Sequence, residues 1–286
     1  MENPKSKQDE QAERISGRMG RIKNKILVMS GKGGVGKTTV AVNLAYAMAV
    51  SGKKTGLLDV DLHGPNVAKM LGIEGKTLAQ NNGAITPFAA EHGLKVISMA
   101  LLLENSDEPV IWRGPLKTGV IGQFLGDVEW GDLDYLIIDS PPGTGDEPLS
   151  ICQLIKDITG AIIVTTPQDV AILDSRKAVM FARRLDVPVT GIIENMSGFT
   201  CPHCHKNINI FKKGGAEKTA QSMNIPFLGC ISFNPQMVEA GDAGIPFISS
   251  SKNNFVSKEE FGKIVEKIET VMQKNKEAVT ALSRNR

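Results

Sequence analysis

Several features are scarce in this 286-residue chain, and each scarcity excludes a class of protein. Only four cysteines are present, which is too few for a disulfide framework and leaves metal binding or simple burial as their roles. Two of them, Cys152 and Cys230, lie in apolar stretches and are expected to be core thiols. The formal charge is only +2, so no strong overall field points to nucleic acid or an acidic membrane as the main partner.

Long apolar runs are also absent. No stretch approaches the length needed to cross a bilayer, and the opening segment, MENPKSKQDEQAER, lacks the apolar core of a secretory signal. Its acidic residues are atypical of a mitochondrial presequence. We therefore expect residues 1–22 to be a flexible polar tail on a cytoplasmic protein that has no membrane contact.

A regular alternation of strand-like and helix-like segments begins at about residue 24. Short apolar runs such as KILVMS, LDYLIID and GAIIVTT alternate with helical patterns such as VAVNLAYAMAV. This order is typical of an α/β fold in which helical crossovers join parallel strands and cover both faces of the sheet. Near-continuous apolar strands fit a sheet that is buried on both sides.

The remaining segments predict further elements of one domain. AITPFAAEHGLKVISM predicts a hairpin that leads into a strand, and GPLKTGVIGQFLGDV predicts a helix. Ser257 and Glu260 form a capping-box pattern before apolar residues at helical spacing. No internal repeat or long linker appears. We expect a single domain over residues 23–273, with a metal-binding loop at 196–213 and a frayed tail at 274–286.

A phosphate-binding loop follows the first predicted strand. Residues 31–39, GKGGVGKTT, match G-x-x-x-x-G-K-[ST] between a strand and a helix, which is the context in which this P-loop motif binds nucleotide. Its glycines let backbone N–H groups face phosphate oxygens at the positive end of a helix. Lys37 then meets the β- and γ-phosphates, and the Thr38 hydroxyl completes a Mg²⁺ shell. The residues predicted to bind ATP are Gly31, Lys32, Gly33, Gly34, Val35, Gly36, Lys37, Thr38 and Thr39.

Three aspartates follow strand-like segments, at the edge of the sheet where ligands bind in such folds. Asp59 and Asp61 share one side of their strand, so that one can serve structure while the other reaches water or metal. Asp139 ends a strongly apolar strand and is placed to order Mg²⁺ through water, rather than to cap a helix. Gly143 and Gly145 beyond it make a flexible loop able to respond to the γ-phosphate.

A cysteine pair, Cys201 and Cys204, lies in the segment GFTCPHCHKN. The spacing suits a soft metal, but a closed zinc or iron–sulfur site needs four ligands. Two such chains related by a two-fold axis would bring four thiolates together, which suits a [4Fe–4S] cluster. The alternatives are a zinc knuckle that uses His203 or His205 within one chain, and a redox or purely structural pair.

Taken together, these segments resemble one family of nucleotide-binding proteins. KGGVGKTT, with the additional lysine Lys32, looks like the deviant Walker A loop of the MinD/ParA/nitrogenase-reductase class of dimeric ATPases. From spacing alone, Lys32 fits either a solvated surface lysine or a contact to a partner's phosphates. DVDLHGPN, IWRGP, DYLIIDSPPGTGDEPL, VTTPQDVAILDSRKA and GIIENMSGFTCPHC are similar to segments of the Mrp/ApbC ATPases that carry iron–sulfur clusters. The resemblance spans roughly residues 22–250.

The resemblance implies a role for each matching residue. Lys32 would cross a homodimer interface to the partner's nucleotide, with Lys37 on the phosphates and Asp61 orienting the attacking water. Asp139 matches the acidic residue after the fourth strand, and Asn195 matches the asparagine that contacts adenine. The cysteine pair would hold a [4Fe–4S] cluster between the two subunits.

Two departures from the family are visible. The eukaryotic cytosolic relatives have a four-cysteine cluster near the N-terminus, whereas residues 1–24 here contain no cysteine. The family commonly has glycine after the second cysteine of the pair, where this chain has His205. A histidine contribution to the metal site therefore stays open.

The expected function is a slow ATPase that passes its cluster to apo-proteins and works with a cluster-assembly scaffold. Turnover should be slow because no in-cis arginine finger is evident, and Arg113 fits an interface or switch contact better. One alternative is a spatial organiser of the partition type. The C-terminal segment QKNKEAVTALSRNR does not supply its amphipathic membrane helix, and a near-neutral charge does not favour nucleic acid. The other alternative is an ATP-coupled reductase, whose ligands come from two widely separated cysteines.

Overall fold

The computed structural model describes residues 6–62, 64–81, 83–102, 114–201, 203–249 and 255–284. The strands of its main sheet are β1 (Ile22–Ser30), β2 (Thr55–Asp59), β5 (Phe88–Ala89), β6 (Lys95–Ser98), β7 (Leu133–Asp139), β8 (Gly160–Thr165), β9 (Val189–Asn195) and β12 (Phe227–Ile231). Two small antiparallel hairpins pair β3 (Ala79–Asn81) with β4 (Ala84–Thr86), and β10 (Phe199–Thr200) with β11 (Asn207–Ile208).

Helices account for most of the rest of the described chain. They are α1 (Lys7–Met19), α2 (Lys37–Val50), α3 (Val67–Met70), α4 (Gly114–Gly126), α5 (Asp146–Leu154), α6 (Asp169–Arg184), α7 (Gly215–Met223), α8 (Pro235–Asp242) and α9 (Phe255–Arg284). Single 3₁₀ turns occur at Glu91–Gly93, Met99–Leu101 and Phe247–Ser249. Within the described ranges, no helix combines the length and the apolar character needed to cross a membrane.

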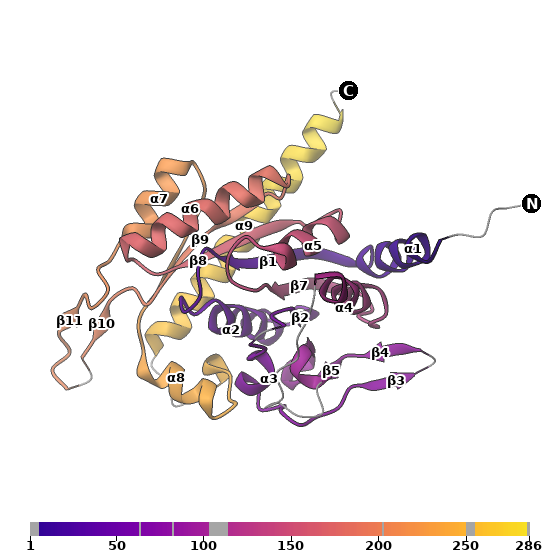
Figure 1. Cartoon of the computed structure of the whole chain (residues 1–286). Coiled ribbons are helices and arrows are strands. Elements are labelled where there is room, and N and C mark those ends of the chain that lie inside the picture. The colour runs from indigo at the N-terminus through magenta and orange to yellow at the C-terminus, as the bar shows by residue number, and fades with distance from the viewer. Residues whose placement is uncertain are drawn as a thin grey trace, which may run out of the picture.

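The main sheet has the strand order β12-β9-β8-β1-β7-β2-β6-β5. Every neighbouring pair is parallel except β5 and β6, which are antiparallel. Figure 1 shows α6 and α7 on one face of the sheet, and α2 and α8 on the other. The predicted α/β fold, a mostly parallel sheet with helices on both faces of a single domain, is confirmed.

Apolar side chains fill both faces of the central strands, as their continuous apolar sequence predicts. In β1, Ile26 and Val28 belong to the core beneath α2 and α9, whereas Leu27 and Met29 belong to the core beneath α4, α5 and α6. All four are completely buried. The sheet therefore forms a rigid platform, and the loops at the carboxyl ends of its strands build the site.

The N-terminal segment differs from the prediction. We expected a flexible polar tail over residues 1–22, but α1 occupies most of it and begins with a capping box between Ser6 and Asp9. Ile15 and Met19 are buried where α1 packs on α4. The expectation failed because these two residues are the helix's only large apolar side chains, so the periodic signal is short.

The C-terminal helix also differs from the prediction at both ends. It begins at Phe255, so Ser257 lies inside the helix instead of at its N-cap, and it continues into residues 274–286, which we expected to fray. The carboxylate of Glu260 instead accepts hydrogen bonds from the backbone N–H and the hydroxyl of Ser232, at 3.0 and 2.6 Å. These bonds fasten α9 to the loop that follows β12.

We predict that replacing Ile15 by alanine will lower the free energy of unfolding by about 2 to 4 kcal/mol, because the change leaves a cavity between α1 and α4. Urea denaturation followed by circular dichroism measures the loss. Glu10→Ala is the matched control, since Glu10 is exposed on the same helix. Equal stability of the two variants would mean that α1 is not docked on the domain.

Candidate nucleotide site and cysteine hairpin

The phosphate loop runs between β1 and α2 with almost no clearance from its neighbours. Gly34 and Gly36 have φ angles of 78° and 77°, a region that glycine adopts without steric cost. A β-carbon on Gly31 would lie 2.1 Å from the backbone of Asp174 in α6, and one on Gly36 would lie 2.2 Å from Asn195 Nδ2. Any larger residue at these two positions would force the loop away from α6 and β9.

A cavity of about 390 Å³ opens over this loop. The run from Lys32 to Thr39 forms one wall, and Asp61 lies beside it. The opposite wall comes from α8, where Met237 and Val238 provide apolar surface. The amino end of α2 therefore faces the cavity with its backbone N–H groups and positive dipole, while α8 offers an apolar surface suited to a base.

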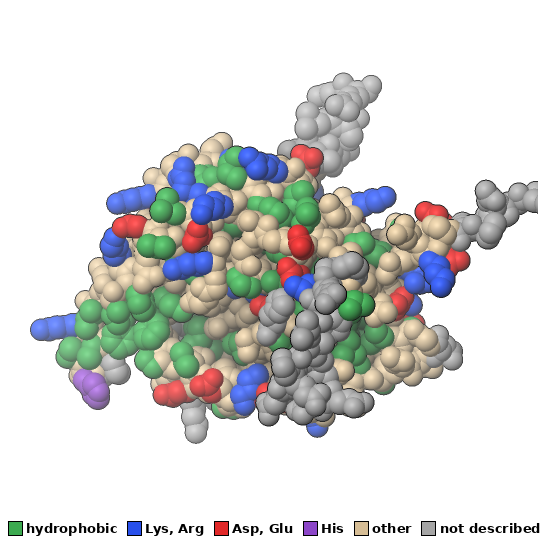
Figure 2. Space-filling model, viewed as in Figure 1, with side chains coloured by type: hydrophobic (Ala, Val, Ile, Leu, Met, Phe, Trp, Pro, Cys, Tyr) green, Lys and Arg blue, Asp and Glu red, His purple; other side chains and the backbone are tan. Residues whose placement is uncertain are grey.

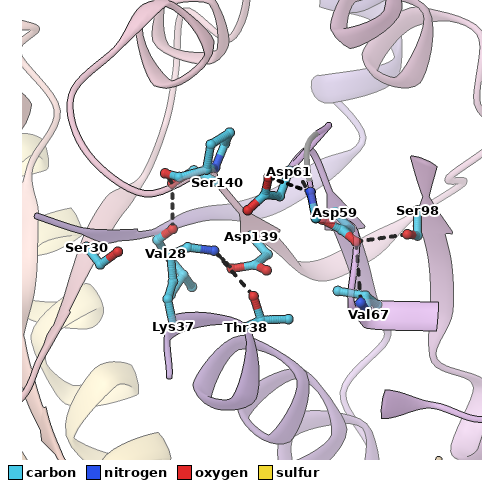
Figure 3. Close-up of polar contacts among 12 residues, drawn as sticks. Val28, Ser30, Lys37, Thr38, Asp59, Asp61, Val67, Ser98, Asp139 and Ser140 are labelled. Atoms are coloured by element: carbon cyan, nitrogen blue, oxygen red, sulfur yellow. Dashed lines mark hydrogen bonds and ion pairs between the residues drawn. The ribbon is translucent and has the colours of Figure 1, made fainter. Parts of the chain in front are cut away.

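Lys37 reaches across the edge of the sheet to Asp139, as Figure 3 shows. Its Nζ donates to Asp139 Oδ1 at 2.5 Å, and both side chains are buried. Burial raises the pKa of Asp139, and the positive charge of Lys37 opposes that rise. Among the described residues, Asp139 Oδ2 has no hydrogen-bond partner. A buried carboxylate oxygen of this kind, close to the Thr38 hydroxyl in Figure 3, fits a hydrated Mg²⁺ ion.

Asp59 and Asp61 have different environments. Asp59 is completely buried, and its carboxylate accepts from Ser98 Oγ at 2.8 Å and from the Asp61 backbone N–H at 3.1 Å. Burial, followed by the charge of Asp139, raises the pKa of Asp59 to about 8. Asp61 is only half-buried and lines the cavity. Of the two aspartates, Asp61 is therefore the one that lines the cavity, while Asp59 supports the backbone. The role of Asp61 toward the attacking water stays a prediction.

Lys32 and Asn195 lie on different sides of the phosphate loop. Lys32 is half-exposed and lines the cavity, so its ammonium group is accessible. Asn195 is only 5% exposed, and its Nδ2 donates to the Val35 carbonyl at 2.9 Å. In this arrangement Asn195 supports the loop from behind, outside the described cavity wall. Its contact with adenine stays a prediction.

The cysteine pair lies in the turn of the β10–β11 hairpin, which projects from one end of the sheet (Figure 1). Cys201 is half-buried and Cys204 is exposed. The backbone closes the turn, because Cys201 N–H donates to the Lys206 carbonyl at 3.0 Å and His205 N–H donates to the Cys201 carbonyl at 2.9 Å. The backbone N–H of Cys204, then that of His203, lowers the pKa of the Cys201 thiol. The turn therefore favours the thiolate, which is the form that binds metal.

No third ligand joins this pair within the described part of the chain. There, no group of three His, Cys, Asp or Glu side chains is placed to hold one metal ion. His203 and His205 are exposed, but they do not complete a site with the cysteines. Within the described residues, the geometry does not support a zinc knuckle in one chain.

The other two thiols have the character of packed side chains. Cys152 in α5 and Cys230 in β12 are both half-buried. Burial raises the pKa of Cys152 to about 11 and also raises that of Cys230. A thiol with a raised pKa is a poor metal ligand at neutral pH, which distinguishes these two cysteines from Cys201.

Two contributors to the site were not predicted. The apolar wall from α8 has no motif, since Met237 and Val238 look like any amphipathic helix face. Glu194, at the end of β9, is completely buried, and its only sequence signal is a charged residue in the otherwise apolar run GIIEN. Arg113, considered above as an interface or switch contact, lies outside the described residues.

Comparison with known proteins gives consistent matches over most of the chain. The family model ParA, described as NUBPL iron-transfer P-loop NTPase, matches residues 21–269. The iron-sulfur cluster carrier protein of Methanocaldococcus jannaschii is 50% identical over 268 residues, which cover 94% of this chain and 91% of that protein. The cytosolic Fe-S cluster assembly factor NUBP2 homolog of Trichoplax adhaerens is 48% identical over 232 residues, which cover 80% and 88%.

Solved structures show the same architecture. A nucleotide-binding protein from Archaeoglobus fulgidus, in complex with ADP and with cobalt, aligns with a TM-score of 0.73 at 39% identity, covering 82% of this chain and 91% of that one. The septum site-determining protein MinD of Pyrococcus horikoshii, complexed with Mg-ADP, aligns with a TM-score of 0.63 at 24% identity, covering 86% and 95%. The second match shows a shared fold.

We predict that Lys37→Ala will abolish nucleotide binding and also destabilise the unliganded protein by about 3 to 5 kcal/mol, because the change leaves the buried Asp139 charge unpaired. Calorimetric ADP titration and thermal melting measure the two effects separately. Adding Asp139→Asn should restore most of the stability but none of the binding. Lys53→Ala, which breaks a half-exposed ion pair with Glu269, is the control and should change neither property.

Proposed function

This chain belongs to the family of NUBPL iron-transfer P-loop NTPases, and from that premise we propose that it is an ATPase that carries iron–sulfur clusters. The observation that supports this most is the cysteine turn. It offers two thiols, one with a lowered pKa, and no third ligand among the described residues. The names of the relatives from Methanocaldococcus and Trichoplax agree with a role in carrying or assembling such clusters.

The cargo is a [4Fe–4S] cluster held between two copies of the chain. Such a cluster takes four thiolates, and a two-fold dimer supplies two from each Cys201–Cys204 pair. Lys32, accessible at the cavity, points to the same dimer because it reaches the partner's phosphates. Within a single chain, Lys32 lies beside the site where the phosphates of that chain's own nucleotide would bind.

Exposed apolar residues near the hairpin support this dimer. Hydrophobic side chains gather at the hairpin end of the molecule, as Figure 2 shows. Those of the first turns of α6 and of the hairpin are between 46% and 64% exposed, and they are Val170, Leu173, Ile208 and Ile210. An ion pair between Lys212 and Asp169 holds the hairpin next to the first turn of α6. A second copy that covered this surface would bury it and place the two cysteine pairs together.

The ATPase reaction uses the residues that line the cavity. Backbone N–H groups of the loop bind the phosphates, Lys37 compensates their charge, and Asp61 orients the attacking water. Mg²⁺, held by Thr38 and through water by Asp139, would supply further positive charge at the phosphates. Turnover is slow because no arginine is among the described residues that line the cavity. Binding or hydrolysis changes how tightly the cluster is held, and a coupling of about 1 to 3 kcal/mol is enough for this.

The recipients are apo iron–sulfur proteins in the cytosol, and a cluster-assembly scaffold supplies the cargo. The cysteine turn supports transfer, because Cys204 is exposed and Cys201 only half-buried, so that thiolates of another protein can approach a cluster held there. The likeness to MinD concerns the fold, so it does not favour a spatial organiser. The two cysteines are three positions apart, which does not favour a reductase with widely separated ligands.

We predict that Cys201→Ala and Cys204→Ala will each abolish cluster binding. Anaerobic reconstitution of the unaltered protein should give about four irons and four sulfides per dimer, measured by elemental analysis together with the mass of the same sample. Cys152→Ala is the matched control and should keep the full complement. Zinc bound by a monomer, with iron absent, would contradict the bridging cluster.

We predict that Lys32→Ala will suppress ATP hydrolysis while ATP still binds. The reason is that Lys32 acts on the partner's nucleotide, whereas Lys37 and the loop backbone hold the chain's own. Phosphate release and fluorescent nucleotide titration separate the two effects. Unimpaired turnover in this variant would return Lys32 to the role of a solvated surface lysine.

A further inference from the structure

One buried carboxylate joins both ends of the cysteine hairpin. Glu194 is completely buried at the end of β9. Its Oε1 accepts from Ser197 Oγ at 2.6 Å and from the Gly214 backbone N–H at 2.8 Å, and its Oε2 accepts from the Ala216 backbone N–H at 2.8 Å. Ser197 lies where the chain enters the hairpin, and Gly214 lies where it leaves. The carboxylate thus closes the hairpin at its base.

The same carboxylate also caps α7. Gly214 is the N-cap residue of that helix and has no side chain to accept a hydrogen bond from the first turn. Glu194 takes this role from a different element, and its negative charge is favourable at a helix N-terminus. Three hydrogen-bond donors therefore converge on this one side chain. The hairpin base and the start of α7 are therefore fixed to the end of β9.

Packing around the hairpin base continues this connection toward the cysteines. The rings of Phe199 and Phe211, one from each side of the hairpin, both lie edge-on to Phe233, with centroids 6.0 and 6.1 Å away. The Ser197 backbone N–H donates to the Ile231 carbonyl of β12 at 2.9 Å. Because these contacts leave the base of the hairpin little freedom to bend, a displacement at the end of β9 moves the whole hairpin with it.

The next residue of β9 contacts the phosphate loop. Asn195 Nδ2 donates to the Val35 carbonyl and lies so close to Gly36 that no β-carbon fits there. Successive side chains of a strand point to opposite faces, so Glu194 meets the hairpin on one face and Asn195 meets the phosphate loop on the other. The two contacts are one residue apart, about 3.8 Å along the backbone.

We propose that Glu194 is a positioning residue that links the phosphate loop to the cysteine hairpin. Nucleotide binding then changes the position of the hairpin relative to β9, through Asn195 and Glu194. The proposal rests on the proposed function, since it identifies the residues through which nucleotide acts on the cargo. When phosphates bind, the loop that holds the Val35 carbonyl adjusts, Asn195 follows, and the carboxylate of Glu194 moves the hairpin base with it. Glu194 is completely buried and is not among the described residues that line the cavity.

Hydrogen–deuterium exchange of the full-length protein without cluster tests this link directly. In the unaltered protein, ADP should slow amide exchange both in the phosphate loop and in residues 198–213 of the hairpin. In Glu194→Gln, one backbone N–H loses its acceptor because the amide NH₂ replaces an oxygen. ADP should still protect the phosphate loop but no longer change exchange in the hairpin. A purely structural role for Glu194 would alter exchange equally with and without ADP.

A second measurement follows the cargo. In Glu194→Gln, the affinity of the reconstituted protein for its cluster should fall roughly 10- to 100-fold, the effect typical of residues that orient metal ligands, and the ADP affinity should not change. Glu217→Gln is the matched control, because Glu217 lies in the same first turn of α7 but is exposed. It should behave as the unaltered protein in both measurements.

The outcomes separate this proposal from the function on which it rests. If Glu194→Gln keeps ADP-dependent protection of the hairpin, the positioning role is overturned even where the cluster binds normally. If the unaltered protein takes up no cluster, the carrier function fails, while the exchange measurement still decides the role of Glu194. If Glu194→Gln does not fold, Ser197→Ala takes its place. Loss of the ADP effect in that variant supports the link, and retention overturns it.

Discussion

The buried ion pair between Lys37 and Asp139 is the interaction on which the nucleotide site depends. The parallel register of β2 and β7 sets Asp59 directly beside Asp139, so two carboxylates meet in the interior, where charge is costly. Lys37 is the buried cation that pairs with Asp139. Phosphate oxygens attract the same ammonium group. The ion pair therefore joins the phosphate loop to the end of β7.

The parts of the fold that follow from local pattern were predictable from the sequence. Continuous apolar strands, the loop motif at residues 31–39 and the helix of GPLKTGVIGQFLGDV each have a signal within a few residues, because backbone geometry and burial set the residue types there. The sequence also placed Asp61 and Asp139 correctly at the edge of the sheet. In a parallel sheet, all strands have their carboxyl ends at one edge, so residues that follow these strands lie at the same edge as the phosphate loop.

The parts that failed depend on contacts between distant segments. α1 has two large apolar residues, and its helix is fixed by the surface of α4, which no local pattern describes. The spacing of Glu260 fits a capping box, but in the fold its carboxylate accepts hydrogen bonds from Ser232. Glu194 looked like part of a buried strand, although a residue of that charge is rarely buried without a reason. Glu194 is buried because its carboxylate accepts hydrogen bonds from the backbone N–H groups of residues that follow the hairpin.

The apolar residues beside the cysteine hairpin have a consequence for the single chain. Val170, Leu173, Ile208 and Ile210 contact water when the molecule is alone, and burying such surface is favourable by about 25 cal/mol for each Å² removed from water. The single chain therefore exposes a surface whose burial against another apolar surface is favourable. On concentration, or at high concentrations of salts that are excluded from protein surfaces, the chain should self-associate through this end first, and detergent or a bound partner should keep it dispersed.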